Sequence, residues 1–188
     1  MLKVLRCMAL LAVSLAVTVH AEELSAIAKA KVSVEVEKAK SLAADPVIVK
    51  AVKEFNANKP APLRGMTQTK WEALAATDSI VTGLASNAVA KFIKSHVDEM
   101  VSEAFLSGAD GTKVALLAKT TNWNHTGAAK FEDPMQGKTW QGSAEKDLST
   151  DVLQLQIAVP VLDEGKSIGV LVIGLKVRDL ASRHATAD

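Results

Sequence analysis

The chain has one cysteine in 188 residues, only 4% aromatic residues and almost no excess of charge of either sign. Its 22 Lys and Arg against 21 Asp and Glu give a formal net charge of +1. This leaves too little positive charge to neutralise a phosphate backbone, so we expect no nucleic-acid partner. With 48% hydrophobic and 23% charged residues, the composition excludes a disordered or fibrous chain and is typical of one folded domain.

The chain begins with a pattern that predicts a secretory signal peptide at residues 1–21. Two basic residues precede an apolar run at 8–19. Small residues occupy positions 19 and 21, which are the −3 and −1 positions of a cleavage site after residue 21. The apolar run is shorter than the roughly 20 residues of a membrane-spanning helix. Cys7 precedes the run, so we expect neither a lipid anchor nor a disulfide, and a periplasmic location is favoured.

From residue 22 to residue 58 we expect a helical segment. Its first helix is predicted from apolar residues at spacings of four and three, with Lys and Glu between them: Leu24, Ala28, Val32, Val36, Ala39 and Ala43. The alternating stretch 32–36 would suit a strand, but its Ala-, Glu- and Lys-rich flanks favour a helix. Asp45 and Pro46 are a cap and a first helical residue, which predicts a second helix with one apolar face: Val47, Ile48, Ala51, Val52 and Phe55.

Residues 59–188 are expected to form the main domain, helical at first and then rich in strands. A short helix is predicted at 67–75 and one longer helix at 78–97, with these buried candidates: Ile80, Leu84, Val89, Phe92 and Ile93. Two hairpins are predicted, one from 100–106 and 113–119, the other from 152–161 and 167–177. The polar segment 120–148 has no clear period yet holds three aromatic residues, so we expect an ordered loop over a binding site.

Several motifs in this second half resemble one family of sensor domains. Residues 105–115 (FLSGADGTKVA), then Thr120 and Thr121, then 136–140 (QGKTW), resemble the central part of the extracytoplasmic PAS-like domains called Cache or PDC. Three further motifs are similar to the end of that family, including its last two strands: DLST at 147–150, QIAVPVLD at 156–163 and IGVL at 168–171. The resemblance covers about residues 25–180.

The resemblance implies an α+β fold, with a long N-terminal helix packed on a five-stranded antiparallel PAS-like sheet. It also implies a small-molecule pocket on one sheet face, under the loop 120–148, and a membrane receptor or kinase as partner. Many relatives have an Asp-Glu pair near the tryptophan, whereas this chain has Asn122 and the sequence Gln-Gly-Lys at 136–138. The ligand class therefore cannot be copied from the family.

Six residues are our candidates for ligand binding: Trp123, Trp140, His125, Lys130, Thr121 and Asp147. The two indoles can stack on a planar or carboxylate-bearing ligand and donate N–H groups, while the histidine and the lysine can neutralise an anion. The threonine and the aspartate can supply a hydroxyl and an acceptor. The alternatives stay open, because tryptophans also fill cores and short polar side chains also cap turns.

Catalytic and metal-binding patterns are absent from the sequence. After the signal peptide the histidines are widely spaced, without nearby cysteines or a carboxylate pattern, so we expect neither a metal nor a cofactor. The motif Gly-Lys-Ser at 165–167 joins two predicted strands and is a hairpin turn, not a phosphate loop. No Gly-x-Ser-x-Gly motif occurs, so we expect no enzyme.

Three functions fit these observations, in decreasing order of support. The first is a secreted, non-catalytic sensor module that binds a small organic ligand, expected to carry a carboxylate. The second is an interaction protein whose N-terminal helix forms a homodimer or docks on a receptor without any ligand. The third is a hydrolase with unmarked catalytic residues, which would need a titratable group with a perturbed pKa in the pocket.

Overall fold

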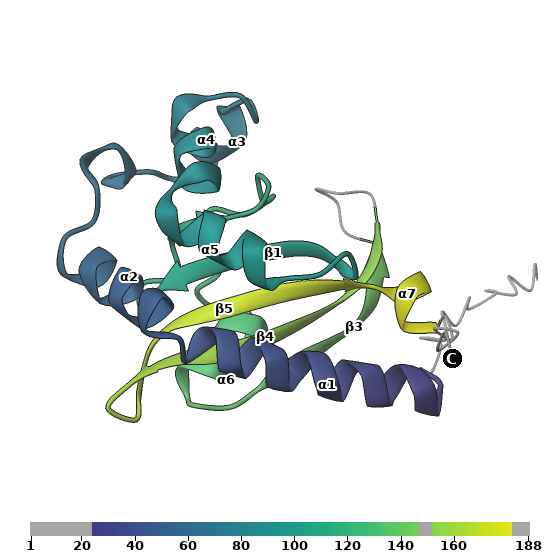
Figure 1. The fold of residues 1–188 in the computed structure, drawn as a ribbon. Helices are drawn as coiled ribbons and strands as arrows, with labels where there is room; N and C mark the ends of the chain where they lie inside the picture. The colour runs from purple at the N-terminus through teal and green to yellow at the C-terminus, as the bar shows by residue number, and fades with distance from the viewer. Residues whose placement is uncertain (1–23, 147–151, 182–188) are drawn as a thin grey trace, which may run out of the picture.

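The computed structural model describes residues 24–146 and 152–181 (Figure 1), so the predicted signal peptide lies outside the described residues. The described helices are α1 Ala26–Ala43, α2 Pro46–Ala57, the short 3-10 helix η1 Ala61–Leu63, α3 Gln68–Ala73, α4 Ser79–Ser86, α5 Ala88–His96, α6 Ala129–Met135 and α7 Val177–Ala181. The strands are β1 Val101–Gly108, β2 Lys113–Leu116, β3 Trp140–Lys146, β4 Leu153–Asp163 and β5 Lys166–Lys176.

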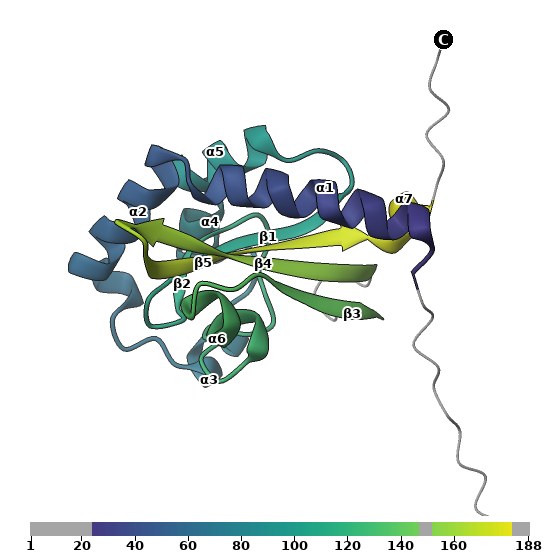
Figure 2. The same ribbon diagram turned by 90° about the horizontal axis from the view of Figure 1, so that it is seen from below.

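The five strands form one antiparallel sheet in the order β2-β1-β5-β4-β3. The long strand β5 is central, and the helix α1 contacts β4, β5 and the C-terminal helix α7. Figure 2 shows α1 on one side of the sheet and α6 on the other. The predicted α+β fold, with a long N-terminal helix on a five-stranded antiparallel sheet, is confirmed.

The helix α1 forms where the apolar spacing predicts it. The Ser25 hydroxyl accepts from the Ala28 N–H at 3.2 Å and caps the first turn. Four residues of the predicted stripe are buried: Ala28, Val32, Ala39 and Ala43. Val36 is half-buried, and Glu35 and Leu42, which the stripe did not include, are buried as well. Burial of this face outweighs the strand-like alternation at 32–36.

The predicted second helix is α2, and its cap is the expected one. The Asp45 carboxylate accepts from the Val47 N–H at 2.8 Å, and Pro46 occupies the first helical position. Ile48, Val52 and Phe55 are buried, as predicted. Val47 is exposed instead, because it lies in the first turn on the solvent side of the helix.

The single helix expected at 78–97 is wrong, because the chain forms two helices that meet at Asn87. The Asn87 side-chain oxygen accepts from the Ala90 N–H at 2.8 Å, and its amide donates to the Val114 carbonyl at 3.0 Å. Asparagine competes with the helix backbone and favours the cap position, so it ends α4 and starts α5. The same side chain ties the start of α5 to β2.

The segment 120–148, expected as a loop, contains the helix α6 and the edge strand β3. The helix has only seven residues with a proline inside, which is too short to produce a visible helical period. The strand pairs with β4 through a register shift between Gln141 and Ala144, which interrupts the alternation that would have predicted it. This strand completes the five-stranded sheet.

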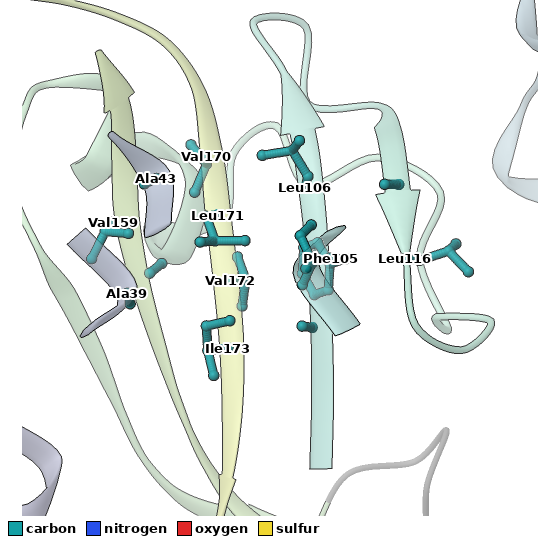
Figure 3. Close-up of a cluster of buried hydrophobic side chains, with 14 of the residues drawn as sticks. Ala39, Ala43, Phe105, Leu106, Leu116, Val159, Val170, Leu171, Val172 and Ile173 are labelled. Carbon is teal, nitrogen blue, oxygen red and sulfur yellow. The ribbon is translucent and has the colours of Figure 1, made fainter. Parts of the chain in front are cut away.

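The two faces of the sheet differ in chemistry. Leu106 of β1, Leu171 of β5 and Val159 of β4 are paired in register and share the apolar face that α1 covers. Figure 3 shows these side chains with Ala39 and Ala43 of α1. The alternate residues of the same strands point to the face covered by α6, where charged and amide side chains occur among the apolar ones.

Gly169 lets α2 pack against the neighbouring strands β1 and β5, and we expect its substitution to destabilise the fold. A Cβ there would collide with the Ser107 carbonyl oxygen and come within 2.8 Å of Val52 Cγ1. Gly169→Ala should therefore lower the free energy of unfolding by about 2–3 kcal/mol in urea denaturation.

The matched control is Gly83→Ala in α4, where no atom lies within 4 Å of the added Cβ. It should raise the free energy of unfolding by about 0.5–1 kcal/mol, because alanine loses less backbone entropy in a helix. Equal stability of the two variants would contradict the packing described here.

Candidate ligand-binding site

A cavity of about 560 Å³ lies on the α6 face of the sheet. Its floor comes from β1 and β4, and one wall comes from β3, beginning at Trp140. The opposite side comes from residues 120–130, which lead into and begin α6. The cavity thus lies where the family resemblance implied a pocket, on one sheet face under the segment 120–148.

The floor of the cavity is a hydrogen-bonded group of one carboxylate and two amides. The Glu103 carboxylate of β1 accepts from the Gln154 amide at 3.1 Å and from the Gln156 amide at 2.7 Å, both on β4. Glu103 is only 4% exposed, so these bonds replace the water that its charge would otherwise need. Gln154 also accepts a hydrogen bond from the Ser102 hydroxyl.

Gly174 makes this floor possible. The strands β1 and β4 are not neighbours, because β5 lies between them, and Gly174 is the β5 residue opposite both Glu103 and Gln156. A Cβ at position 174 would collide with the Gln154 side chain and come within 3.1 Å of the Ser102 hydroxyl. The missing side chain therefore leaves room for Glu103 and the two glutamines to meet across β5.

The helix α6 is fixed above the floor by polar contacts at both of its ends and along its length. The Glu132 carboxylate accepts from the Gly127 N–H at 2.7 Å before the first turn, and the Ser167 hydroxyl of β5 donates to the Pro134 carbonyl at 2.9 Å. The Lys130 ammonium donates to the Gln156 side-chain oxygen at 2.8 Å. Lys130 thereby joins α6 to the same group of amides that holds Glu103.

His125 lies on the cavity wall in contact with a buried lysine. Its Nδ1 is 2.6 Å from the Nζ of Lys113, a β2 residue with no exposed surface. Its ring stacks on Phe105, with 4.8 Å between ring centroids, and the Lys113 Nζ lies 3.9 Å from the Phe105 centroid. The three side chains form one packed unit, of which His125 and Phe105 face the cavity.

This packing sets the protonation of His125. Burial, followed by the charges of Lys113 and Lys130, lowers its pKa to about 2. Burial likewise holds the pKa of Lys113 well below its usual value, while the Glu103 carboxylate acts in the opposite direction. His125 is consequently a neutral imidazole at physiological pH.

Two ring nitrogens of cavity-lining residues lack a protein partner in the part of the chain that the structure describes. One is the Nε2 side of His125, whose Nδ1 is engaged with Lys113. The other is the indole N–H of Trp140, whose ring folds back over Gly142 so closely that a Cβ there would come within 2.6 Å. Neither atom is a fully buried unsatisfied group, since Ser107 Oγ alone has that status within the described ranges.

The structure brings four of the six predicted residues to the cavity wall: His125, Lys130, Trp140 and Thr121. Trp123 is instead 2% exposed and packs on Trp71, with 5.2 Å between ring centroids. Its backbone N–H donates to the Gln68 side chain at 2.9 Å, which anchors the segment to α3. Asp147 lies outside the described residues.

The sequence reasoning missed the floor and the buried lysine. Glu103, Gln154 and Gln156 are polar residues within otherwise apolar strands, and the i, i+2 spacing of the two glutamines places them on one face. A polar pair on a buried strand face was therefore a usable signal. Lys113 had no such signal, because a lysine beside a turn is ordinarily exposed.

No family profile and no curated protein matches this sequence. Among solved structures, the E. coli DcuS sensor domain is similar with a TM-score of 0.54 at 14% identity, covering 83% of this chain and 96% of that domain. The chain has the fold of this sensor domain.

Two further sensor structures align over much of this chain. The sensor domain of the V. cholerae histidine kinase DctB gives a TM-score of 0.49 at 13% identity and covers 84% of this chain. The Campylobacter jejuni chemoreceptor Tlp3 with isoleucine bound gives 0.43 at 14% identity and covers 82%. This chain spans 56% of the DctB domain and 64% of the Tlp3 domain.

Within residues 24–146 and 152–181, no helix combines the length and apolar character needed to cross a bilayer. The same ranges contain no group of three or more His, Cys, Asp or Glu side chains placed to hold a metal ion.

The low pKa of His125 predicts a loss of stability in mild acid. In the unfolded chain a histidine titrates near pH 6.5, whereas the folded form stays neutral down to about pH 2. Below about pH 6.5 the unfolded state binds the extra proton, so the stability contributed by this site falls by at most about 1.4 kcal/mol per pH unit.

Urea unfolding at several pH values between about 6.5 and 4.5 measures this slope. His125→Gln is the matched variant, because its side-chain oxygen can still accept from Lys113 but does not titrate. The wild type should lose stability more steeply than the variant as the pH falls. Parallel curves would show that His125 titrates normally in the folded protein.

Proposed function

We propose that the chain is a secreted, periplasmic, non-catalytic sensor module that binds a small organic ligand carrying a carboxylate. The ligand would occupy the cavity under the segment 120–148. A membrane receptor or kinase would be the partner that reads the bound state. The fold shared with the DcuS sensor domain supports the sensor role, and the chemistry of the cavity supports the ligand class.

The unpartnered donors on the cavity wall carry this proposal. When Nδ1 of His125 accepts from Lys113, its Nε2 is a donor, so this nitrogen and the indole N–H of Trp140 can both bind an acceptor, and the Lys130 ammonium stands on the same wall. A carboxylate offers two oxygens with about four acceptor sites and no donor, so it satisfies such a wall. A bound charge-assisted hydrogen bond contributes about 1.5–3 kcal/mol, which is sufficient to select acids over neutral isosteres.

The same cavity is poorly suited to hydrolysis. A general base needs a pKa near the working pH, and His125, the one imidazole on the cavity wall among the described residues, has a pKa of about 2. The Glu103 carboxylate is already engaged by two amide donors. These observations favour binding over the hydrolase alternative.

A second function rests on two exposed apolar residues of α1. Ile27 and Val34 are seven residues apart, so they share one helix face, and they are 43% and 56% exposed. This face would serve a homodimer or a receptor contact. It is compatible with ligand binding and would become the leading function if the cavity bound nothing.

A thermal-shift screen of residues 22–188 against small carboxylates, amines, amino acids and purines tests the ligand class. An acid at a hundred times its dissociation constant should stabilise the fold by about 2.7 kcal/mol. The shift should be lost in Trp140→Ala and in Lys130→Met, since both remove donors from the wall.

Trp123→Phe is the matched control, because this core indole lies away from the cavity lining and its loss should lower the melting temperature without abolishing the shift. A hit that survives both wall variants would place the ligand elsewhere. A flat screen over all four chemical classes would overturn the ligand-binding proposal and leave the α1 face as the functional surface.

A further inference from the structure

Lys113 lies behind the cavity wall and touches the ligand-facing residues without reaching the cavity itself. Its side chain is fully buried, and its Nζ contacts the Nδ1 of His125 at 2.6 Å and the face of Phe105 at 3.9 Å from the centroid. Burying an amine completely costs free energy, because it loses its contacts with water. Most lysines avoid this cost by extending the charged end of the side chain to the protein surface.

The chemistry of the pair determines which nitrogen of His125 carries the proton. The Glu103 carboxylate favours the charged form of Lys113 against the cost of burial. As an ammonium, Lys113 has three donors and no acceptor, so Nδ1 of His125 accepts from it, whereas a neutral amine would leave either direction open. A neutral imidazole then keeps its single proton on Nε2. The stacking on Phe105, with 21° between the ring planes, holds the ring, and the backbone N–H of His125 donates to the Gly111 carbonyl at 3.2 Å and fixes the main chain beside it.

We propose that Lys113 is a positioning residue that sets the hydrogen-bonding polarity of the cavity, by holding His125 in the form that presents Nε2–H toward the ligand. This part of the cavity then selects an acceptor oxygen and rejects an ammonium or amide N–H. The inference rests on the proposed function for its ligand, but the state of His125 can be measured in the empty protein. Glu103 and Lys130 are the other charged groups acting on Lys113.

The low pKa of His125 supports a fixed arrangement. His125 stays neutral across the physiological range, so its role as donor does not change with pH. The hydrogen bond to Nδ1 uses the buried side of the ring, and the opposite nitrogen has no protein partner among the described residues. A fixed donor on a rigid wall loses little entropy when a ligand binds.

Nitrogen-15 NMR of the histidine rings in the ligand-free wild type tests the first half of the proposal. We expect the proton of His125 on Nε2 and none on Nδ1, unchanged between about pH 5 and pH 8. In Lys113→Met, which keeps most of the side-chain volume but has no donor, the proton should move partly or wholly to Nδ1. Lys113→Gln, which restores an N–H donor without charge, should return it toward Nε2.

Titration with sodium acetate and with methylammonium chloride at equal ionic strength tests the second half. Acetate should shift the His125 ring signals of the wild type saturably, and methylammonium should not. Loss of the Nε2 donor should weaken acetate binding more than tenfold in Lys113→Met, with partial recovery in Lys113→Gln.

A wild-type proton on Nδ1 would overturn the proposal, as would a Lys113→Met variant that leaves both the proton and the acetate affinity unchanged. In either case acetate binding itself would still support the carboxylate site. If acetate and every other acid fail to bind while the proton lies on Nε2 and moves in Lys113→Met, the proposed function falls and the role of Lys113 in the wall stands. If the variants do not fold, the wild-type spectrum alone shows whether His125 carries its proton on Nε2.

Discussion

The absence of a side chain at position 174 permits the polar floor on which the cavity depends. In a sheet, side chains of non-neighbouring strands are separated by the residue between them, which ordinarily fills the space. Gly174 leaves that space empty, so Glu103 of β1 can bind Gln154 and Gln156 of β4 across the central strand. The buried carboxylate is thereby satisfied, and Lys130 of α6 is joined to the same group.

The rest of the architecture follows from placing apolar and polar chemistry on opposite faces of one sheet. The helix α1 seals the apolar face with small and branched residues, which stabilises the sheet without involving the cavity (Figures 2 and 3). The other face is covered by a short helix and by the segment bound to α3 through Gln68 and Trp71. The apolar packing against α1 and the cavity therefore lie on opposite faces of the sheet.

Much of the fold could be predicted from the sequence because its elements have strong local signals. The spacing in α1, the Asp45 and Pro46 cap and the terminal hairpin all act over a few residues, and all are confirmed. The break at Asn87 and the edge strand β3 depend on contacts with β2 and β4, which are distant in sequence. The wall residues near the motifs were found, whereas the pairings of Lys113 with His125 and of Glu103 with the glutamines exist only in the folded chain.

A crystal structure of residues 22–188 grown with the acid that gives the largest thermal shift tests the central claim, that the donor wall is a carboxylate site. We expect carboxylate oxygens within hydrogen-bond distance, about 2.7–3.2 Å, of the His125 Nε2 and the Trp140 indole nitrogen, with Lys130 beside them. An acid bound elsewhere, or a cavity that holds only water beside an intact wall, would contradict it.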